Sequence, residues 1–80
     1  MKARVYVTLK TTVLDPQGAT IRSALAGMGH ADIADVRQGK YFELQLAGED
    51  QQQAKTQVEK IAREVLTNPV IEEFHYKLEG

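Results

Sequence analysis

The spacing of apolar residues changes along the chain between a strand-like and a helical repeat, and the order of these changes constrains the fold most. Apolar and polar residues alternate over 2–10, which is typical of a strand with one covered face. A spacing of three and four follows over 21–28 and recurs over 54–65, which predicts two amphipathic helices. Alternation returns over 41–47 and 70–78, and 33–38 is a further, less regular strand candidate. The predicted order of elements is β-α-β-β-α-β.

This order, with no long linker between elements, predicts a single domain over residues 1–80. Right-handed crossovers favour a ferredoxin-like α+β fold with βαββαβ topology. That fold is a two-layer sandwich, in which a four-stranded antiparallel sheet carries two helices on one face. The other sheet face is then open, and parity places on it these residues of the first and third strands: Arg4, Tyr6, Thr8, Tyr41, Glu43 and Gln45.

The segment Asp15-Pro16-Gln17-Gly18 marks the start of the first predicted helix. Asp15 suits the N-cap and Pro16 the first helical position, where no backbone donor is needed. A phosphate loop would need more glycines at fixed spacing, and the Asp15 carboxylate repels an anion. Gly29 lies where a left-handed residue ends a helix. We expect Gly18 to leave the helix start open to a partner's backbone, and the fold to tolerate glutamate in its place.

The second predicted strand is the least regular part of the pattern. Ile33 and Val36 have opposite parity, so this strand needs a bulge or a late start, and its register stays open. Gly39 follows it and suits the turn of a hairpin that leads into 41–47.

Length and charge narrow the classes of function. The chain has 80 residues and no cysteine, so its margin of stability is thin and oligomerisation is the expected support. Ten Lys+Arg and eleven Asp+Glu leave a net charge of −1, which supplies no positive field for a nucleic-acid partner. No leader or membrane-spanning stretch is visible, so we expect a cytoplasmic protein with no membrane partner.

No residues show the spacing of a catalytic or metal site. His30 and His75 lie far apart in the sequence, without the converging donors that a metal needs. Glu72 and Glu73 are neighbours on a strand and point to opposite faces. We therefore predict no catalytic, cofactor-binding or metal-binding residue. The segment 39–44 faintly resembles the aromatic motif of RNA-recognition domains, but its parity and charge do not fit, and the arginine loop of an acylphosphatase is missing.

Three segments, TLKTTVLDPQG, VRQGKYFELQL and NPVIEEFHYKLE, occur in this order and spacing and together resemble the PurS family over essentially the whole chain. PurS is the small subunit of the bacterial and archaeal phosphoribosylformylglycinamidine synthase of purine biosynthesis. The resemblance implies a homodimer or dimer of dimers that assembles with PurL, a synthetase using ATP and magnesium, and PurQ, a glutaminase that releases ammonia. The small subunit is implied to bind no cofactor and to be a non-catalytic bridge that helps shield the ammonia path.

Tyrosines on an open sheet face are typical of a protein contact, because the ring buries area while the hydroxyl keeps a hydrogen-bond partner. A bare, solvent-facing sheet is the alternative interpretation. With the start of the first helix added, the predicted contact residues are Arg4, Tyr6, Asp15, Gln17, Gly18, Lys40 and Tyr41.

A rival hypothesis on the same fold is a dimeric regulatory domain of the ACT type, which would bind an amino acid at the loop before the first helix. Domains of that type place a glycine ahead of the helix. Here Gly18 lies inside the first turn, behind Asp15-Pro16.

Overall fold

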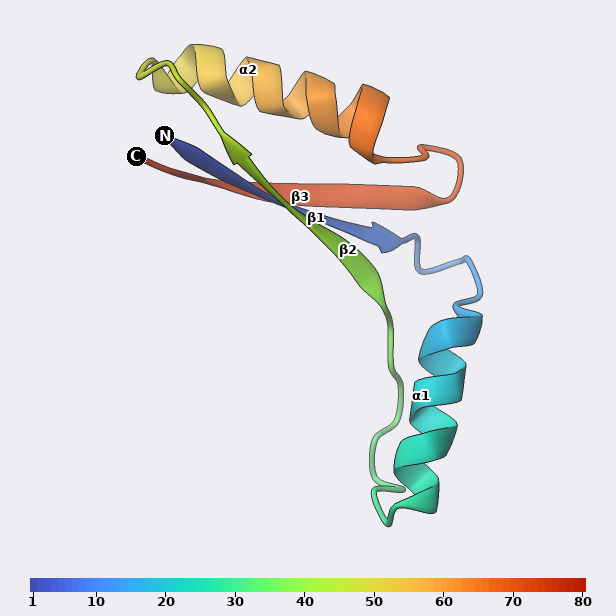
Figure 1. The fold of residues 1–80 in the computed structure, drawn as a ribbon. Coiled ribbons are helices and arrows are strands. Elements are labelled where there is room, and N and C mark those ends of the chain that lie inside the picture. The colour runs from blue at the N-terminus through green and yellow to red at the C-terminus, as the bar shows by residue number, and fades with distance from the viewer.

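The computed structural model describes residues 1–80 and contains a three-stranded antiparallel sheet in the order β2-β1-β3 (Figure 1). The elements are β1 (Lys2–Leu9), α1 (Pro16–Gly27), β2 (Gly39–Gln45), α2 (Gln51–Ile61), the π-helical turn η1 (Ala62–Leu66) and β3 (Glu72–Glu79). No helix is long and apolar enough to cross a bilayer.

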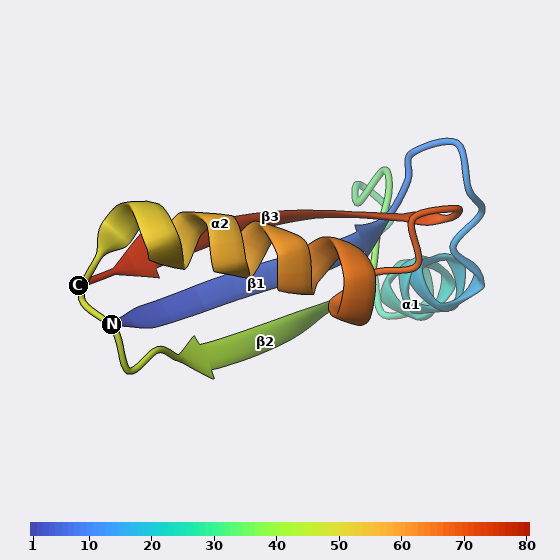
Figure 2. The same ribbon diagram turned by 90° about the horizontal axis from the view of Figure 1, so that it is seen from above.

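The core lies between the sheet and α2, which runs along one sheet face (Figure 2). The alternation of β1 buries Ala3, Val5 and Val7 completely on that face. Val58 of α2 is four residues before Ala62, so both point the same way and are also fully buried. Apolar residues of β2 and β3 flank this cluster and are partly buried. The predicted alternation and the predicted second helix are confirmed.

The prediction of a fourth strand is wrong. Residues 33–38 pair with no strand, and Gly39 begins β2 opposite Thr8 instead of turning a hairpin. The segment runs beside α1, beyond the end of the sheet (Figure 1). The backbone N–H of Gln38 donates to the Asp15 carboxylate at 2.6 Å, a side-chain acceptor in place of a strand partner. The mismatched parity of 33–38 agrees with this, because no face of the segment is consistently apolar.

The prediction that two helices cover one sheet face is also wrong. Only α2 lies on the sheet, whereas α1 projects from its end (Figures 1 and 2). Met28, just after α1, is 73% exposed, and Ile21 within α1 is 40% exposed. A helical repeat shows that one side of a helix is apolar, but it does not specify which surface covers that side. We call residues 11–38, comprising α1 and the segments on both sides of it, the arm.

The predicted ends of α1 are confirmed. The Asp15 carboxylate accepts from the backbone N–H of Gly18 at 2.9 Å, and Pro16 occupies the first helical position. Gly29 has φ +97°, a left-handed conformation that suits glycine. The backbone N–H of His30 reaches the carbonyl of Leu25 at 2.8 Å, which closes the helix in a Schellman motif.

Candidate functional site

The sheet face opposite α2, called the outer face, carries an aromatic row across all three strands. Tyr6 on β1 lies directly opposite Tyr41 on β2 and His75 on β3. The Tyr6 and His75 rings stack with centroids 4.8 Å apart and an angle of 13° between their planes. The Tyr6 and Tyr41 rings lie 5.1 Å apart and are tilted by 38°. Cross-strand pairing thus places a row of contacting aromatic rings at the middle of the face.

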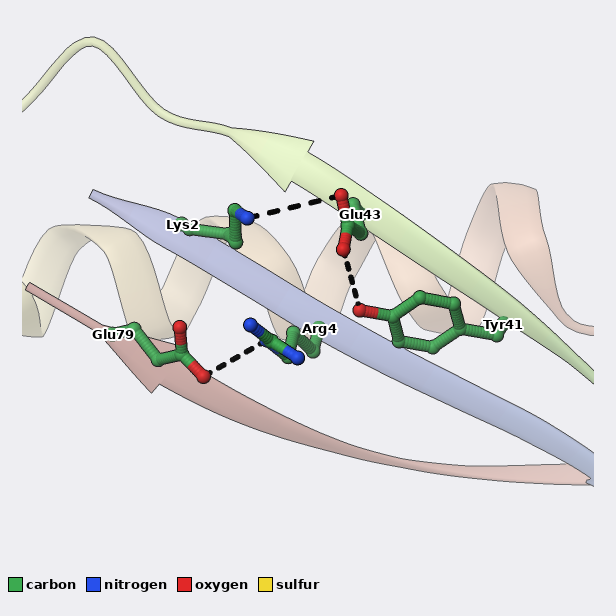
Figure 3. Close-up of polar contacts among 5 residues, drawn as sticks. All are labelled: Lys2, Arg4, Tyr41, Glu43 and Glu79. Carbon is green, nitrogen blue, oxygen red and sulfur yellow. Dashed lines mark hydrogen bonds and ion pairs between the residues drawn. The ribbon is translucent and has the colours of Figure 1, made fainter.

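Four charged side chains on the outer face form ion pairs beside this row (Figure 3). Lys2 Nζ lies 3.8 Å from Glu43 Oε2, and Arg4 Nε lies 2.8 Å from Glu79 Oε1. The Tyr41 hydroxyl donates to Glu43 Oε1 at 2.8 Å. These side chains remain partly exposed, so the pairs lie at the rim of the aromatic row and not in a dry core.

The pairing shifts the pKa values of these groups in the expected directions. The Glu79 charge raises the pKa of Arg4, and the Tyr41 hydroxyl, followed by Lys2, lowers the pKa of Glu43. Burial, followed by the hydrogen bond to Glu43, raises the pKa of Tyr41. The outer face therefore combines aromatic area with neutralised charge, a composition suited to a protein contact.

The sequence prediction placed Arg4, Tyr6 and Tyr41 on one face, and the register confirms this placement. It treated His75 as an ordinary surface residue and did not recognise the stack with Tyr6. Strand parity puts His75 on the side opposite Phe74 and Tyr76, but only the antiparallel register brings it beside Tyr6. Lys40, another predicted contact residue, lies next to Tyr41 on β2 and therefore points to the other side of the sheet.

The root of the arm, meaning the segments around Asp15 and Arg37 that enter and leave α1, is fixed by hydrogen bonds to side chains of the same chain. The buried Asp15 carboxylate accepts from the N–H of Gly18 through one oxygen and from that of Gln38 through the other. These two hydrogen bonds lower the pKa of Asp15, and the bond from Gln38 has the larger effect. Arg37 Nη2 donates to the carbonyls of Lys10 at 3.1 Å and Val13 at 2.8 Å. The segments entering and leaving α1 are thereby tied together.

Gly18 is buried against this return segment. A Cβ built on Gly18 would lie 2.0 Å from the carbonyl oxygen of Val36 and 3.0 Å from Asp15 Oδ2. The expectation that Gly18 leaves the helix start open is therefore wrong, because the chain's own backbone occupies that space. A contact between Gly18 and a partner stays a prediction.

A shallow pocket of about 180 Å³ lies beside the arm root. Its lining includes three predicted contact residues, Asp15, Gln17 and Lys40. Lys40 Nζ lies 3.2 Å from Glu72 Oε2, and the backbone N–H of Asn68 donates to Glu72 Oε1 at 2.8 Å. The Asn68 N–H, more than Lys40, lowers the pKa of Glu72. The acidic groups of the pocket are thus satisfied from within the chain.

No group of three or more His, Cys, Asp or Glu side chains is placed to hold a metal ion. His30 lies in the arm, just after α1, and His75 lies on the outer face, so the two histidines belong to different parts of the molecule. What the geometry offers is two organised surfaces, the outer face and the arm.

Comparison with known proteins identifies the family. The family model described as PurS, phosphoribosylformylglycinamidine (FGAM) synthase, matches residues 2–80. The chain belongs to the PurS family. The PurS subunit of FGAM synthase from Bacillus subtilis is 41% identical over 78 residues, which cover 98% of this chain and 92% of that protein. The Mycobacterium leprae PurS subunit is 44% identical over 73 residues, covering 91% and 89%.

Solved PurS structures share the whole architecture, arm included. A crystal structure of Bacillus subtilis PurS superposes with a TM-score of 0.87 at 40% identity, covering 99% of this chain and 98% of that one. A structure of PurLQS from Thermotoga maritima matches with a TM-score of 0.86 at 32% identity, covering 95% and 93%. The three-stranded sheet with one covering helix is thus a feature of PurS proteins. These matches give no support to an ACT-type regulatory domain.

Proposed function

We propose that this chain is the PurS-type adaptor subunit of FGAM synthase in purine biosynthesis, and that it acts in the cytoplasm. In this proposal it bridges a PurL-type synthetase and a PurQ-type glutaminase and supports the transfer of ammonia between them. Membership of the PurS family and the likeness to a structure of PurLQS support the assignment.

The observation that carries the adaptor role is the outer face. Its aromatic row lies at the centre, and Lys2, Arg4, Glu43 and Glu79 form ion pairs at the rim. Docking over these pairs therefore need not leave one of these four charges without a partner in a dry interface, which would cost several kcal/mol. We propose that Tyr6 and Tyr41 form the centre of the contact with a larger subunit and that Arg4 lies at its rim.

The chemistry is proposed to belong to the partners. The complex uses ATP and magnesium, and this chain binds neither and supplies no catalytic residue. It is proposed to enter the complex as a homodimer or a dimer of dimers. Its contribution is to hold the two active subunits at a fixed separation, which keeps released ammonia from escaping to solvent.

Reconstitution with PurL and PurQ of one source organism tests the proposal. Glutamine-dependent formation of the amidine should require this chain, whereas the ammonia-dependent reaction of PurL at high ammonium should persist without it. The purified chain alone should neither hydrolyse glutamine nor consume ATP. Equal loss of both synthase activities on omission would contradict a bridging role, since PurL itself would then depend on the chain for chemistry.

The contact surface is tested by titrating variants into the same assay. Tyr6→Ala combined with Tyr41→Ala removes two rings of the row, and central truncations of this kind commonly cost about 2 kcal/mol each. The concentration for half-maximal coupling should rise at least about thirtyfold. Gln57→Ala, an exposed change on α2, is the matched control and should titrate like the parent. A double tyrosine variant that also titrates like the parent would exclude the outer face as the docking surface.

A further inference from the structure

Two charged side chains of the outer face, Lys77 and Glu73 on β3, form no ion pair within the chain. Strand parity places both on the same face as His75, with Lys77 on one side of the aromatic row and Glu73 on the other. Four residues of strand separate them, which corresponds to about 13 Å. The four remaining charges of the face pair with one another. The outer face therefore has an unpaired cation on one side of the row and an unpaired anion on the other.

Lys77 lies beside a second cation. The antiparallel register places it directly opposite Arg4 of β1, and like charges in directly opposite positions destabilise a sheet. Glu79 follows Lys77 on the same face of β3, but its carboxylate is already engaged, with Oε1 lying 2.8 Å from Arg4 Nε. We call Arg4, Lys77 and Glu79 the basic corner. Two cations share one anion there, so the corner keeps an excess of positive charge.

The guanidinium of Arg4 also has unused hydrogen-bond donors. Its contact with Glu79 is made through Nε (Figure 3). The terminal nitrogens Nη1 and Nη2 make no hydrogen bond within the chain and, unlike the buried Nε, remain accessible to solvent. The two N–H groups at the end of a guanidinium match the two oxygens of a carboxylate. The basic corner thus offers a free ammonium group and a free guanidinium end to a partner.

We infer that the basic corner binds a carboxylate of the larger subunit that docks on the outer face. The inference rests on the proposed function and specifies the chemistry of the partner, an aspartate or glutamate side chain held by Lys77 and by the terminal nitrogens of Arg4. A partner that covers Lys77 removes it from water, and a buried charge without a counter-charge is strongly destabilising. A carboxylate at this position supplies the counter-charge and offsets the repulsion between Lys77 and Arg4.

Glu73 makes the contact directional. A partner docked in the reverse orientation would bring its carboxylate to Glu73 and would leave Lys77 without a counter-charge. Like-charge repulsion and an unpaired buried charge both disfavour that orientation. The aromatic row then supplies contact area at the centre, while the basic corner selects the orientation in which the larger subunit docks.

The coupling titration with PurL and PurQ tests the carboxylate site. Lys77→Gln should raise the concentration for half-maximal coupling at least about tenfold, the loss expected for one charge-assisted hydrogen bond. Lys55→Gln makes the same charge change on the exposed side of α2 and should titrate like the parent. Glu73→Gln should not weaken coupling, because the carboxylate of the partner lies on the other side of the row. Equal weakening by Lys77→Gln and Glu73→Gln would overturn the site and favour a second copy of this chain, packed face to face with its Glu73 on Lys77.

Two further measurements separate docking from folding and from the proposed function. Because Lys77→Gln removes the repulsion with Arg4, its melting temperature at the same protomer concentration should equal or exceed that of the parent. If the double variant Tyr6→Ala, Tyr41→Ala weakens coupling and Lys77→Gln does not, the carboxylate site is overturned and docking on the outer face stands. If neither variant weakens coupling, the outer face is excluded and the carboxylate site with it.

Carbodiimide coupling of the assembled complex identifies the partner's group directly, since the reagent joins an amine to a carboxylate in contact with it. Mass spectrometry should find Lys77 joined to an aspartate or glutamate of PurL or PurQ, and Lys77→Gln should lack that product. A product that joins Lys77 only to another copy of this chain would overturn the assignment.

Discussion

The contact between Gly18 and the return segment of the arm yields the sharpest test of the structure. In Gly18→Ala the new Cβ would lie 2.0 Å from the carbonyl oxygen and 2.9 Å from the carbonyl carbon of Val36. Both atoms belong to the backbone, so a simple side-chain rotation cannot relieve the clash. Either α1 or the segment around Val36 must move, and movement of that segment also pulls Gln38 away from the Asp15 carboxylate.

Two opposing effects determine how much Gly18→Ala should change the free energy of unfolding. Alanine gains at most about 1 kcal/mol over glycine through helix propensity. Overpacking at a site that cannot relax costs typically about 1–3 kcal/mol, and a separation of 2.0 Å is far below any ordinary contact. We therefore expect Gly18→Ala to lower the free energy of unfolding by about 1–2 kcal/mol in total. Gly18→Glu carries the same Cβ and should be no better, although a first-turn glutamate suits the helix dipole.

Gly27→Ala is the matched control, because it makes the same substitution in the same helix with nothing within 4 Å of the new Cβ. It should raise stability by roughly 0.5–1 kcal/mol. Urea unfolding followed by circular dichroism measures both variants, at one protomer concentration because self-association would shift the midpoint. If Gly18→Ala is as stable as Gly27→Ala, the return segment does not pack on α1 as described.

Three further predictions follow from the polar contacts and the core. Asp15→Asn removes the carboxylate oxygen that accepts from the Gln38 N–H and should lower the free energy of unfolding. Because folding lowers the pKa of Asp15, this loss of stability should be full above about pH 4 and should shrink as pH falls through the lowered pKa. Denaturation of both proteins across acidic pH checks this, and a loss of stability that does not depend on pH would contradict it. Burial, followed by the hydrogen bond to Glu59, raises the pKa of Tyr76 to about 12. Tyr76→Phe removes that 2.7 Å hydrogen bond and should lower the free energy of unfolding by roughly 1 kcal/mol below about pH 10, and by progressively less above it. Denaturation of both proteins at neutral and alkaline pH tests this. Val58→Ala deletes two methyl groups from a fully buried site and should cost about 2 kcal/mol, whereas a cost below about 0.5 kcal/mol would mean that α2 does not pack on the sheet as described.

The sequence by itself determined the features that depend on nearby residues. Alternation over 2–10 predicted β1 and its buried face, and the Asp15-Pro16 start and Gly29 end bounded α1 correctly. Helical spacing and strand parity are set by backbone geometry within a few residues, so they can be read without knowing the fold. The PurS resemblance was likewise carried by short segments, and the family match over 2–80 confirms it.

Only the tertiary structure decided how those elements meet. Residues 33–38 follow α1 and not the sheet, because the Asp15 carboxylate and the small Gly18 offer them a partner and a close fit. Helical spacing predicted that α1 has an apolar side, but it could not show that no other part of the chain would cover that side. The stack of Tyr6 on His75 joins residues 69 positions apart and exists only through the register of β1 with β3. Such contacts form only when several distant segments pair at the same time, and the spacing of residues within one segment does not specify that pairing.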